Sequence, residues 1–221
     1  MRAEGPYFDE LSVGQEFADA PAYTLTDGRA ATHQAILGDR LRLPLDDRLA
    51  EAVTGRWPIA HPAFVWDVAI GQSTVVTHHV RANLFYRNLA FHRLPAIGDT
   101  LRTVTAVAGL RQNTRREGRP ATGLAALRIV TVDQEDRSVL DFYRCAMLLL
   151  REDVDTGLLD DLDSVVAQGA GPDAVTGWDL GAWEARVAGR SALEAGSRIE
   201  VVGGDVVTSA PELARLDRLS R

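Results

Sequence analysis

Four strand-like stretches follow one another in the middle of the chain, with no helical stretch between them. They span His79 to His92, Thr100 to Gly109, Gly123 to Asp133 and Val139 to Leu150, and turn-forming residues separate them. Strands that arrive in succession in this way form an antiparallel sheet. The preceding stretch, Ala63 to Val76, is mostly apolar and free of proline, and it predicts a long buried helix. One buried helix against such a sheet is an α+β layer arrangement.

Two distant segments share a spacing that predicts an internal duplication. From Gly14 to Thr26, and again from Gly196 to Thr208, a glycine turn and a strand-like stretch lead within 12 residues to a threonine. A side chain of this kind can cap a following helix. The alternative is a chance coincidence of two short segments. We predict a complete module at 1–150, a linker rich in Asp and Gly at 151–176 and an incomplete second copy at 177–221.

The composition narrows the chemistry. All 24 of the cationic residues are arginine, which excludes Schiff-base and phosphate-loop chemistry that needs lysine. The net charge of −7 argues against a nucleic-acid partner. The single cysteine, Cys145, opens an apolar run that is too short to cross a membrane, and it predicts an ordinary core thiol in a reducing cytoplasm. We expect no membrane or targeting segment.

Several short motifs together resemble one known family. Tyr7 to Gly14, Gly38-Asp39, Ala60-His61 and Ile97 to Leu101 follow one another in the order found in the MaoC-like, (R)-specific enoyl-CoA hydratases of the hot-dog fold. The resemblance covers about residues 6–150. It implies a long helix wrapped by an antiparallel sheet, an active site at a subunit or repeat interface and an acyl-CoA thioester as substrate.

Three further segments are similar to the double hot-dog branch of that family, which includes mesaconyl-CoA hydratases and a mycobacterial double hot-dog protein. They are Ala82 to Tyr86, Gly109 to Asn113 and Tyr143-Arg144. Members of this branch carry two complete modules, whereas we expect one module and part of a second here. The resemblance therefore implies a homodimer or a partner hot-dog chain.

The family's hydration motif pairs an aspartate after a glycine with a histidine five residues later. The carboxylate and the imidazole together hold one water and move its proton. Here Asp39 matches the aspartate, but Pro44 stands at the histidine position and cannot ionise. Pro62 likewise replaces a glycine whose backbone N–H stabilises the thioester oxyanion, and proline has no N–H. Pro62 is also what a helix start favours.

The resemblance makes Asp39 the candidate that activates water, and His61, beside the motif positions, the candidate proton carrier. The structural alternatives are a turn or cap aspartate and a satisfied, partly buried histidine. Asn83 and Tyr86 are candidate substrate contacts. Because they are three apart on a strand, we expect them to face opposite sides, so that at most one lines a pocket. The same reasoning applies to the adjacent Tyr143 and Arg144.

A basic run lies between the second and third predicted strands. It contains Arg111, Arg115, Arg116 and Arg119. On an acidic protein, such a run is a candidate site for the phosphates of coenzyme A. The alternative is a solvated hairpin without a ligand.

Three functions are open at this point. The first is addition or removal of water across the double bond of an acyl-CoA thioester. The second is a module that binds an acyl thioester or an oligomeric partner without catalysis, which Pro44 and Pro62 favour. The third is thioester hydrolysis, for which Asp67 is the acidic residue within the predicted helix. We expect no metal and no cofactor besides the coenzyme A of the substrate.

Overall fold

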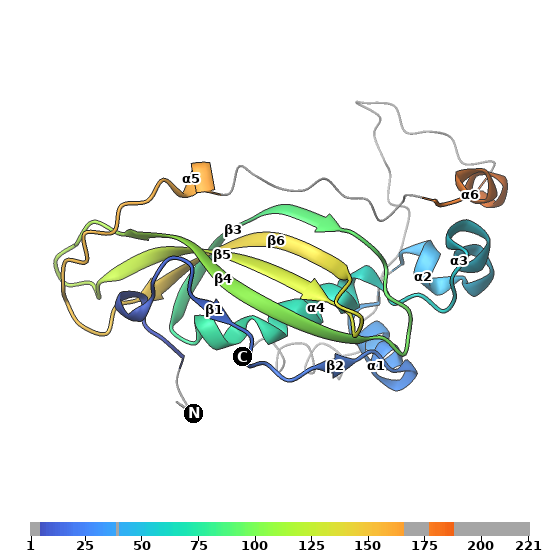
Figure 1. Cartoon of the computed structure of the whole chain (residues 1–221), viewed down its shortest axis with the longest axis horizontal. Coiled ribbons are helices and arrows are strands. Elements are labelled where there is room, and N and C mark those ends of the chain that lie inside the picture. The colour runs from blue at the N-terminus through green and yellow to red at the C-terminus, as the bar shows by residue number, and fades with distance from the viewer. Residues whose placement is uncertain (1–4, 39, 166–176, 188–221) are drawn as a thin grey trace, which may run out of the picture.

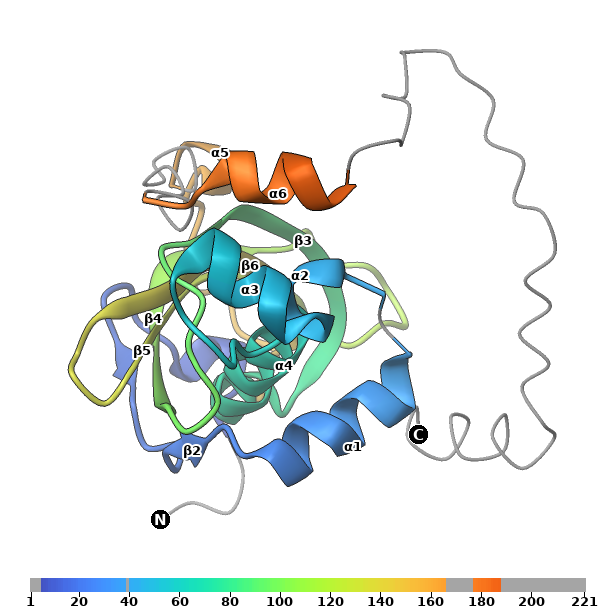
Figure 2. The ribbon, with the colours of Figure 1, turned by 90° about the vertical axis from the view of Figure 1, so that its right-hand side faces the viewer.

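The computed structural model describes residues 5–38, 40–165 and 177–187 of the chain. Within them, a curved antiparallel sheet wraps around one helix, α4 (Pro62–Gln72), as Figures 1 and 2 show. The predicted α+β arrangement of one buried helix against an antiparallel sheet is therefore confirmed.

The elements follow the prediction closely along the sheet. The strands are β1 (Glu16–Phe17), β2 (Tyr23–Thr24), β3 (Val80–Phe91), β4 (Thr100–Gln112), β5 (Thr122–Val132) and β6 (Ser138–Leu149). The other helices are α1 (Asp27–Leu37), α2 (Arg42–Leu45), α3 (Asp47–Thr54), α5 (Leu162–Val165) and α6 (Leu180–Val187), with 3-10 turns η1 (Phe8–Glu10) and η2 (Thr74–Thr77). The apolar stretch predicted as one helix is divided, because α4 ends at Gln72 and η2 follows.

The sheet has the strand order β1-β4-β5-β6-β3, and β2 pairs with β4 off this path. All pairings are antiparallel, as short connections between successive strands require. On β6, Phe142 and Ala146 belong to the clusters on the α4 side, whereas Cys145 belongs to a cluster on the outer face. Within the described residues, β3 is an edge strand.

The start of α4 is where the sequence favours one. Pro62 takes the first helical position, and the Nδ1 atom of His61 accepts the N–H of Ala63 at 3.1 Å. The helix then buries Phe64, Val65, Val68 and Ala69 in a cluster with Leu101, Ile129, Leu140 and Phe142 of the sheet. Full burial of one such side chain stabilises the fold by about 1.5–3 kcal/mol. This cluster therefore holds the helix inside the sheet.

The first part of the predicted linker packs on the outer face of the sheet. Leu162 of α5 is buried beside Leu124, Ala126 and Cys145. Gly109 makes room for it, since a Cβ at that position would lie 3.1 Å from Cδ2 of Leu162. Residues 166–176 and 188–221, which include most of the predicted second copy, lie outside the described residues. The division into a module, a linker and a second copy stays a prediction.

The segment after Gly38 contains two short helices, α2 and α3. Asp46 caps α3, and its Oδ1 atom accepts the N–H of Leu49 at 3.0 Å. Leu49 and Val53 are buried in a cluster against which Trp183 of α6 packs. The buried residues of α2 and α3 therefore form the surface on which α6 packs. These two helices are too short to show a long helical repeat of apolar residues in the sequence.

Gly123→Ala tests the close packing of η1 on β5. A Cβ at this position would lie 2.4 Å from the ring of Phe8, which is fully buried. The ring cannot retreat without disturbing the core, so we expect the free energy of unfolding to fall by about 1–3 kcal/mol. Urea unfolding measures the change. Gly28→Ala on α1, where nothing lies within 4 Å of the added Cβ, is the matched control and should be neutral or slightly stabilising. Equal midpoints for the two variants would contradict this packing.

Candidate functional site

The amino end of α4 carries one of the two predicted catalytic residues. His61 is partly buried there, and its Nδ1 atom caps the helix as an acceptor. With Nδ1 in that role, the neutral ring carries its proton on Nε2, an assignment that follows from the hydrogen bond. Protonation of Nδ1 would remove the cap. His61 is therefore suited to donate a hydrogen bond from Nε2 rather than to accept a proton at Nδ1.

The segment that matches the hydration motif is interrupted by helices. Gly38 ends α1 in the left-handed conformation, with φ 60°, and its N–H donates to the carbonyl of Gln34 at 2.8 Å. Asp39 lies outside the described residues, so its role stays a prediction. Pro44 lies within α2. The position that a histidine would hold in the motif is therefore a helical proline.

A cavity of about 730 Å³ separates α1 from α4, and we call it the α1–α4 cavity. Two titratable residues face each other across it. The Nε2 atom of His33 lies 2.9 Å from Oδ2 of Asp67, and the two side chains are 13% and 52% exposed. The imidazole also lies against the ring of Phe64, with 5.1 Å between ring centres. Sequence reasoning found no signal at His33, because its partner is 34 positions away on another helix.

The two candidate substrate contacts on β3 lie on the same face of the sheet, which corrects the prediction that they face opposite sides. A bulge at Leu84 shifts the register of β3 against β6 and breaks the alternation of side chains. As a result, Asn83 Oδ1 accepts a hydrogen bond from Nε of the inward-facing Arg144 at 2.9 Å. The ring of Tyr86 lies 5.1 Å from that of Trp66 on α4. Both residues therefore belong to the α4 side of the edge strand.

Arg144 is a buried cation with unusual surroundings. It is 4% exposed, and in the part of the chain that the structure describes its Nη1 atom has no hydrogen-bond partner. Burial lowers the pKa of this guanidinium, because the charged form loses its hydration. Tyr143 packs on the outer face with Phe85, so the prediction that Tyr143 and Arg144 face opposite sides is confirmed.

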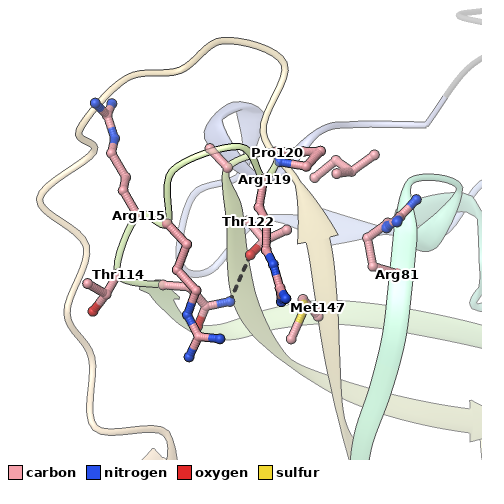
Figure 3. Close-up of a pocket in the computed structure, with 11 residues that line it drawn as sticks. Arg81, Thr114, Arg115, Arg119, Pro120, Thr122 and Met147 are labelled. Atoms are coloured by element: carbon pink, nitrogen blue, oxygen red, sulfur yellow. Dashed lines mark hydrogen bonds between the residues drawn. The ribbon is translucent and has the colours of Figure 1, made fainter.

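A second cavity, of about 660 Å³, lies at the β4–β5 hairpin (Figure 3), and we call it the arginine cavity. Its cationic residues are Arg81 at the start of β3 and Arg115, Arg116 and Arg119 in the hairpin loop. Figure 3 shows Arg81 and Arg119 on either side of Met147. Arg115 lies 3.1 Å from Asp153, which offsets part of its charge. Arg111, predicted to share this role, is not among the lining residues.

The remaining candidate groups are structural. Cys145 is fully buried, and burial raises the pKa of its thiol to about 11, as a core thiol requires. In the described ranges, no cluster of three or more His, Cys, Asp or Glu side chains is arranged to hold a metal ion. None of the helices in those ranges combines the length and the apolar character that a bilayer crossing needs.

Comparison with known proteins shows which proteins this chain is similar to. The chain is 54% identical, with a TM-score of 0.79, to a conserved hypothetical protein from Mycobacterium tuberculosis that has a double hotdog fold, over 86% of this chain and 59% of that one. It is 31% identical over 150 residues to beta-methylmalyl-CoA dehydratase from Chloroflexus aurantiacus, over 67% of this chain and 41% of the dehydratase. A putative MaoC domain protein dehydratase from the same species is 28% identical, with a TM-score of 0.63, over 77% of this chain and 46% of that one.

These comparisons confirm the predicted hot-dog fold. No family model matches the sequence, and the relationship rests on these relatives. The chain belongs to the MaoC-like hot-dog family. It spans between 41% and 59% of the length of the three relatives named above.

Arg144→Met tests the energetic cost of the buried guanidinium. Methionine fills similar space without a charge that needs hydration, so we expect the free energy of unfolding to stay equal or to rise by about 1–4 kcal/mol. Urea unfolding is the measurement. Arg128→Met is the matched control, because Arg128 is half exposed and its Nη2 lies 2.6 Å from Oδ2 of Asp141; its loss should cost less than about 1 kcal/mol. A clear loss of stability in Arg144→Met would show that this charge is compensated.

Proposed function

We propose that the chain is a hot-dog module of an acyl-CoA hydratase or dehydratase, which adds water to, or removes it from, the double bond of an acyl-CoA thioester. The observation that carries this proposal is the relationship over 150 residues to a dehydratase of a CoA thioester. The buried helix start at His61 supports it, because a helix amino end stabilises negative charge that develops on a thioester oxygen.

The departures from the family motif change how that charge would be stabilised. Pro62 has no N–H, and the N–H of Ala63 is donated to His61. The helix amino end at His61 would stabilise this charge through its dipole, and the carboxylate of Asp39 would hold the attacking water by a hydrogen bond. Asn83 and Tyr86 would contact the substrate from the α4 side of β3.

The arginine cavity would hold the phosphates of coenzyme A. Four arginine residues from two elements line it on a chain with a net charge of −7, and guanidinium groups bind phosphate by charge-assisted hydrogen bonds. Of the predicted phosphate ligands, Arg115 and Arg116 lie in this cavity, together with Arg81 and Arg119. Arg111 would take no direct part.

The two cavities lie at opposite ends of the sheet, which supports a role for a second module. The arginine cavity lies where β3 begins, whereas α4 begins beyond the end of β3, where Ile59 bridges to Ala96. The 12 residues of β3 span roughly 40 Å, more than the pantetheine arm that separates the thioester from the phosphates. A second hot-dog module paired antiparallel along β3 would bring its own α4 beside this arginine cavity. A second copy of the chain or a partner hot-dog chain would fill this place.

Light scattering tests the pairing along β3. We expect a particle of twice the 24.0 kDa chain mass. Leu84→Arg places a charge on the exposed bulge of the edge strand and should reduce the particle to a monomer. Val13→Arg, at a side chain of comparable exposure (55% against 47%), is the control and should leave the mass unchanged. A wild-type monomer at micromolar concentration would contradict pairing between two copies of this chain.

Hydration of a panel of short and branched enoyl-CoA thioesters tests the activity. We expect turnover by the wild type and its loss in Asp39→Ala, because the carboxylate no longer activates water. Wild-type binding without turnover would instead support the non-catalytic module.

Paired substrates test the arginine cavity. Arg116→Ala with Arg119→Ala should raise KM for the acyl-CoA about tenfold or more, because a charge-assisted hydrogen bond contributes about 1.5–3 kcal/mol. The N-acetylcysteamine thioester of the same acyl group lacks phosphates, so its KM should not change. Arg102→Ala, at a residue paired with Asp136 near the other end of β4, is the control. Equal effects on both substrates would contradict phosphate binding.

A further inference from the structure

We propose that His33, positioned by Asp67, is the acid–base group for water addition to an α,β-unsaturated acyl thioester whose acyl group lies in the α1–α4 cavity. This inference rests on the proposed function. It supplies the imidazole that the hydration motif lacks at Pro44.

The cavity is built by two facing helix surfaces. Its lining from α1 includes Thr32, His33 and Ile36, and its lining from α4 includes Phe64, Asp67 and Val68, in each case at the three- and four-residue spacing of one helix face. No residue of α1 is fully buried, although Ala30 packs against the core cluster. The helix runs in a different direction from α4, as Figures 1 and 2 together show. The space between the helices is therefore open to a ligand, and the His33–Asp67 pair crosses it.

The pair has the geometry of an oriented base. Oδ2 of Asp67 lies 2.9 Å from Nε2 of His33, so the carboxylate favours the tautomer with the proton on Nε2 and a lone pair on Nδ1. Phe64 packs against the ring and fixes its plane. The His33 side chain is 13% exposed, which leaves access while excluding most water. Nδ1 is then the atom available to a reacting water.

Other histidines of the fold are less suited to this role. His61 and His78 each use Nδ1 to accept a backbone N–H, from Ala63 and Gly5 respectively. The ring of His79 is stacked on Tyr7, with 3.7 Å between centres. His33 differs from these three because a carboxylate, Asp67, binds its Nε2 and leaves Nδ1 to accept a proton.

The cavity suits a short acyl group. Ile36, Phe64 and Val68 supply apolar wall, and Pro21 closes one side. Polar side chains from both helices also line it, among them Arg29, Thr32 and Gln72, and His33 and Asp67 lie together on the helix faces. An unsaturated acyl chain can therefore pack against the apolar wall with its double bond presented to the imidazole.

His33 can both remove a proton from the attacking water and return it to the substrate. His33 Nδ1 takes a proton from a water whose oxygen forms a bond to the β-carbon, and the electron pair of the double bond moves to the α-carbon and the thioester oxygen. The imidazolium then returns the proton to the α-carbon, so one water is added and the ring is neutral again. Asp67 accepts the Nε2–H throughout and stabilises the transient positive ring.

His33→Gln tests the catalytic role. We expect kcat for hydration to fall by about 10²–10⁴-fold, with little change in KM, because the acyl-binding walls remain. His92→Gln, outside both cavities, is the matched control and should keep wild-type kinetics. Circular dichroism melting checks that both variants fold.

Asp67 is a positioning residue, and its test separates orientation from structure. Asp67→Asn should lower kcat with KM unchanged, and Asp67→Glu should restore part of the loss. A rise in KM with unchanged kcat would instead indicate a merely structural wall residue and would overturn the positioning role.

Binding of butyryl-CoA, a saturated thioester that cannot react, provides a readout independent of activity. We expect the imidazole NMR signals of His33 to shift and those of His92 to stay. Wild-type kcat in His33→Gln would overturn this inference and leave the proposed function standing. A wild type without hydration would overturn the proposed function, and unchanged His33 signals would overturn the cavity assignment separately. Release of free coenzyme A thiol that is lost in Asp67→Asn would replace hydration by hydrolysis.

Discussion

The packing of α4 against the concave face of the sheet is the contact on which the rest of the structure depends. Once Phe64, Val65 and Ala69 are buried there, the helical period decides what every other position of α4 faces. Asp67 is left half exposed on the side toward α1, and His61 is fixed at the helix start. A shift of α4 by one residue would bury the carboxylate in an apolar cluster, at a cost that the hydrophobic contacts would have to offset. The packing of the core therefore fixes the positions of the Asp67 carboxylate and the His61 imidazole.

The elements that the sequence predicts are those whose residues follow a regular local pattern. The four long strands and the buried helix follow from local alternation and from an apolar stretch, which depend on neighbouring residues alone. The bulge at Leu84 does not, because one extra residue in β3 is defined only by its register against β6. The His33–Asp67 pair was missed for the same reason, since it joins two helices through their tertiary packing. The α2 and α3 helices depend on a cap at Asp46 and on contacts with α6, neither of which shows as a long period.

Burial separates ionised groups that look alike in the sequence. Asp133 is fully buried, and although burial alone raises the pKa of its carboxyl, hydrogen bonds from the backbone and side chain of Arg137 and from the backbone of Glu135 lower it overall. Its charge is therefore compensated by the turn that leads to Arg137 and by Arg93, whose Nη1 lies 3.2 Å from Oδ2 of Asp133. Arg144 is nearly as deeply buried, but among the described residues its side-chain hydrogen bond is to Asn83, which is neutral. Arg116 and Arg119 of the hairpin loop, in contrast, are exposed and keep their hydration.

The placement of the two cavities bears on why the hydration motif could change. If the second module along β3 is another copy of this chain, the two sites of the pair are equivalent and each must supply its own acid–base group. His33 on α1 then replaces the histidine that the motif lacks at Pro44. If the second module is a different chain, one complete site is enough, and this module needs to contribute only its arginine cavity. The same substitution is tolerated in both cases, but only the symmetric pair requires the His33–Asp67 contact. A homodimer would therefore need the His33–Asp67 pair for catalysis, whereas a pair of different chains would need it only for packing.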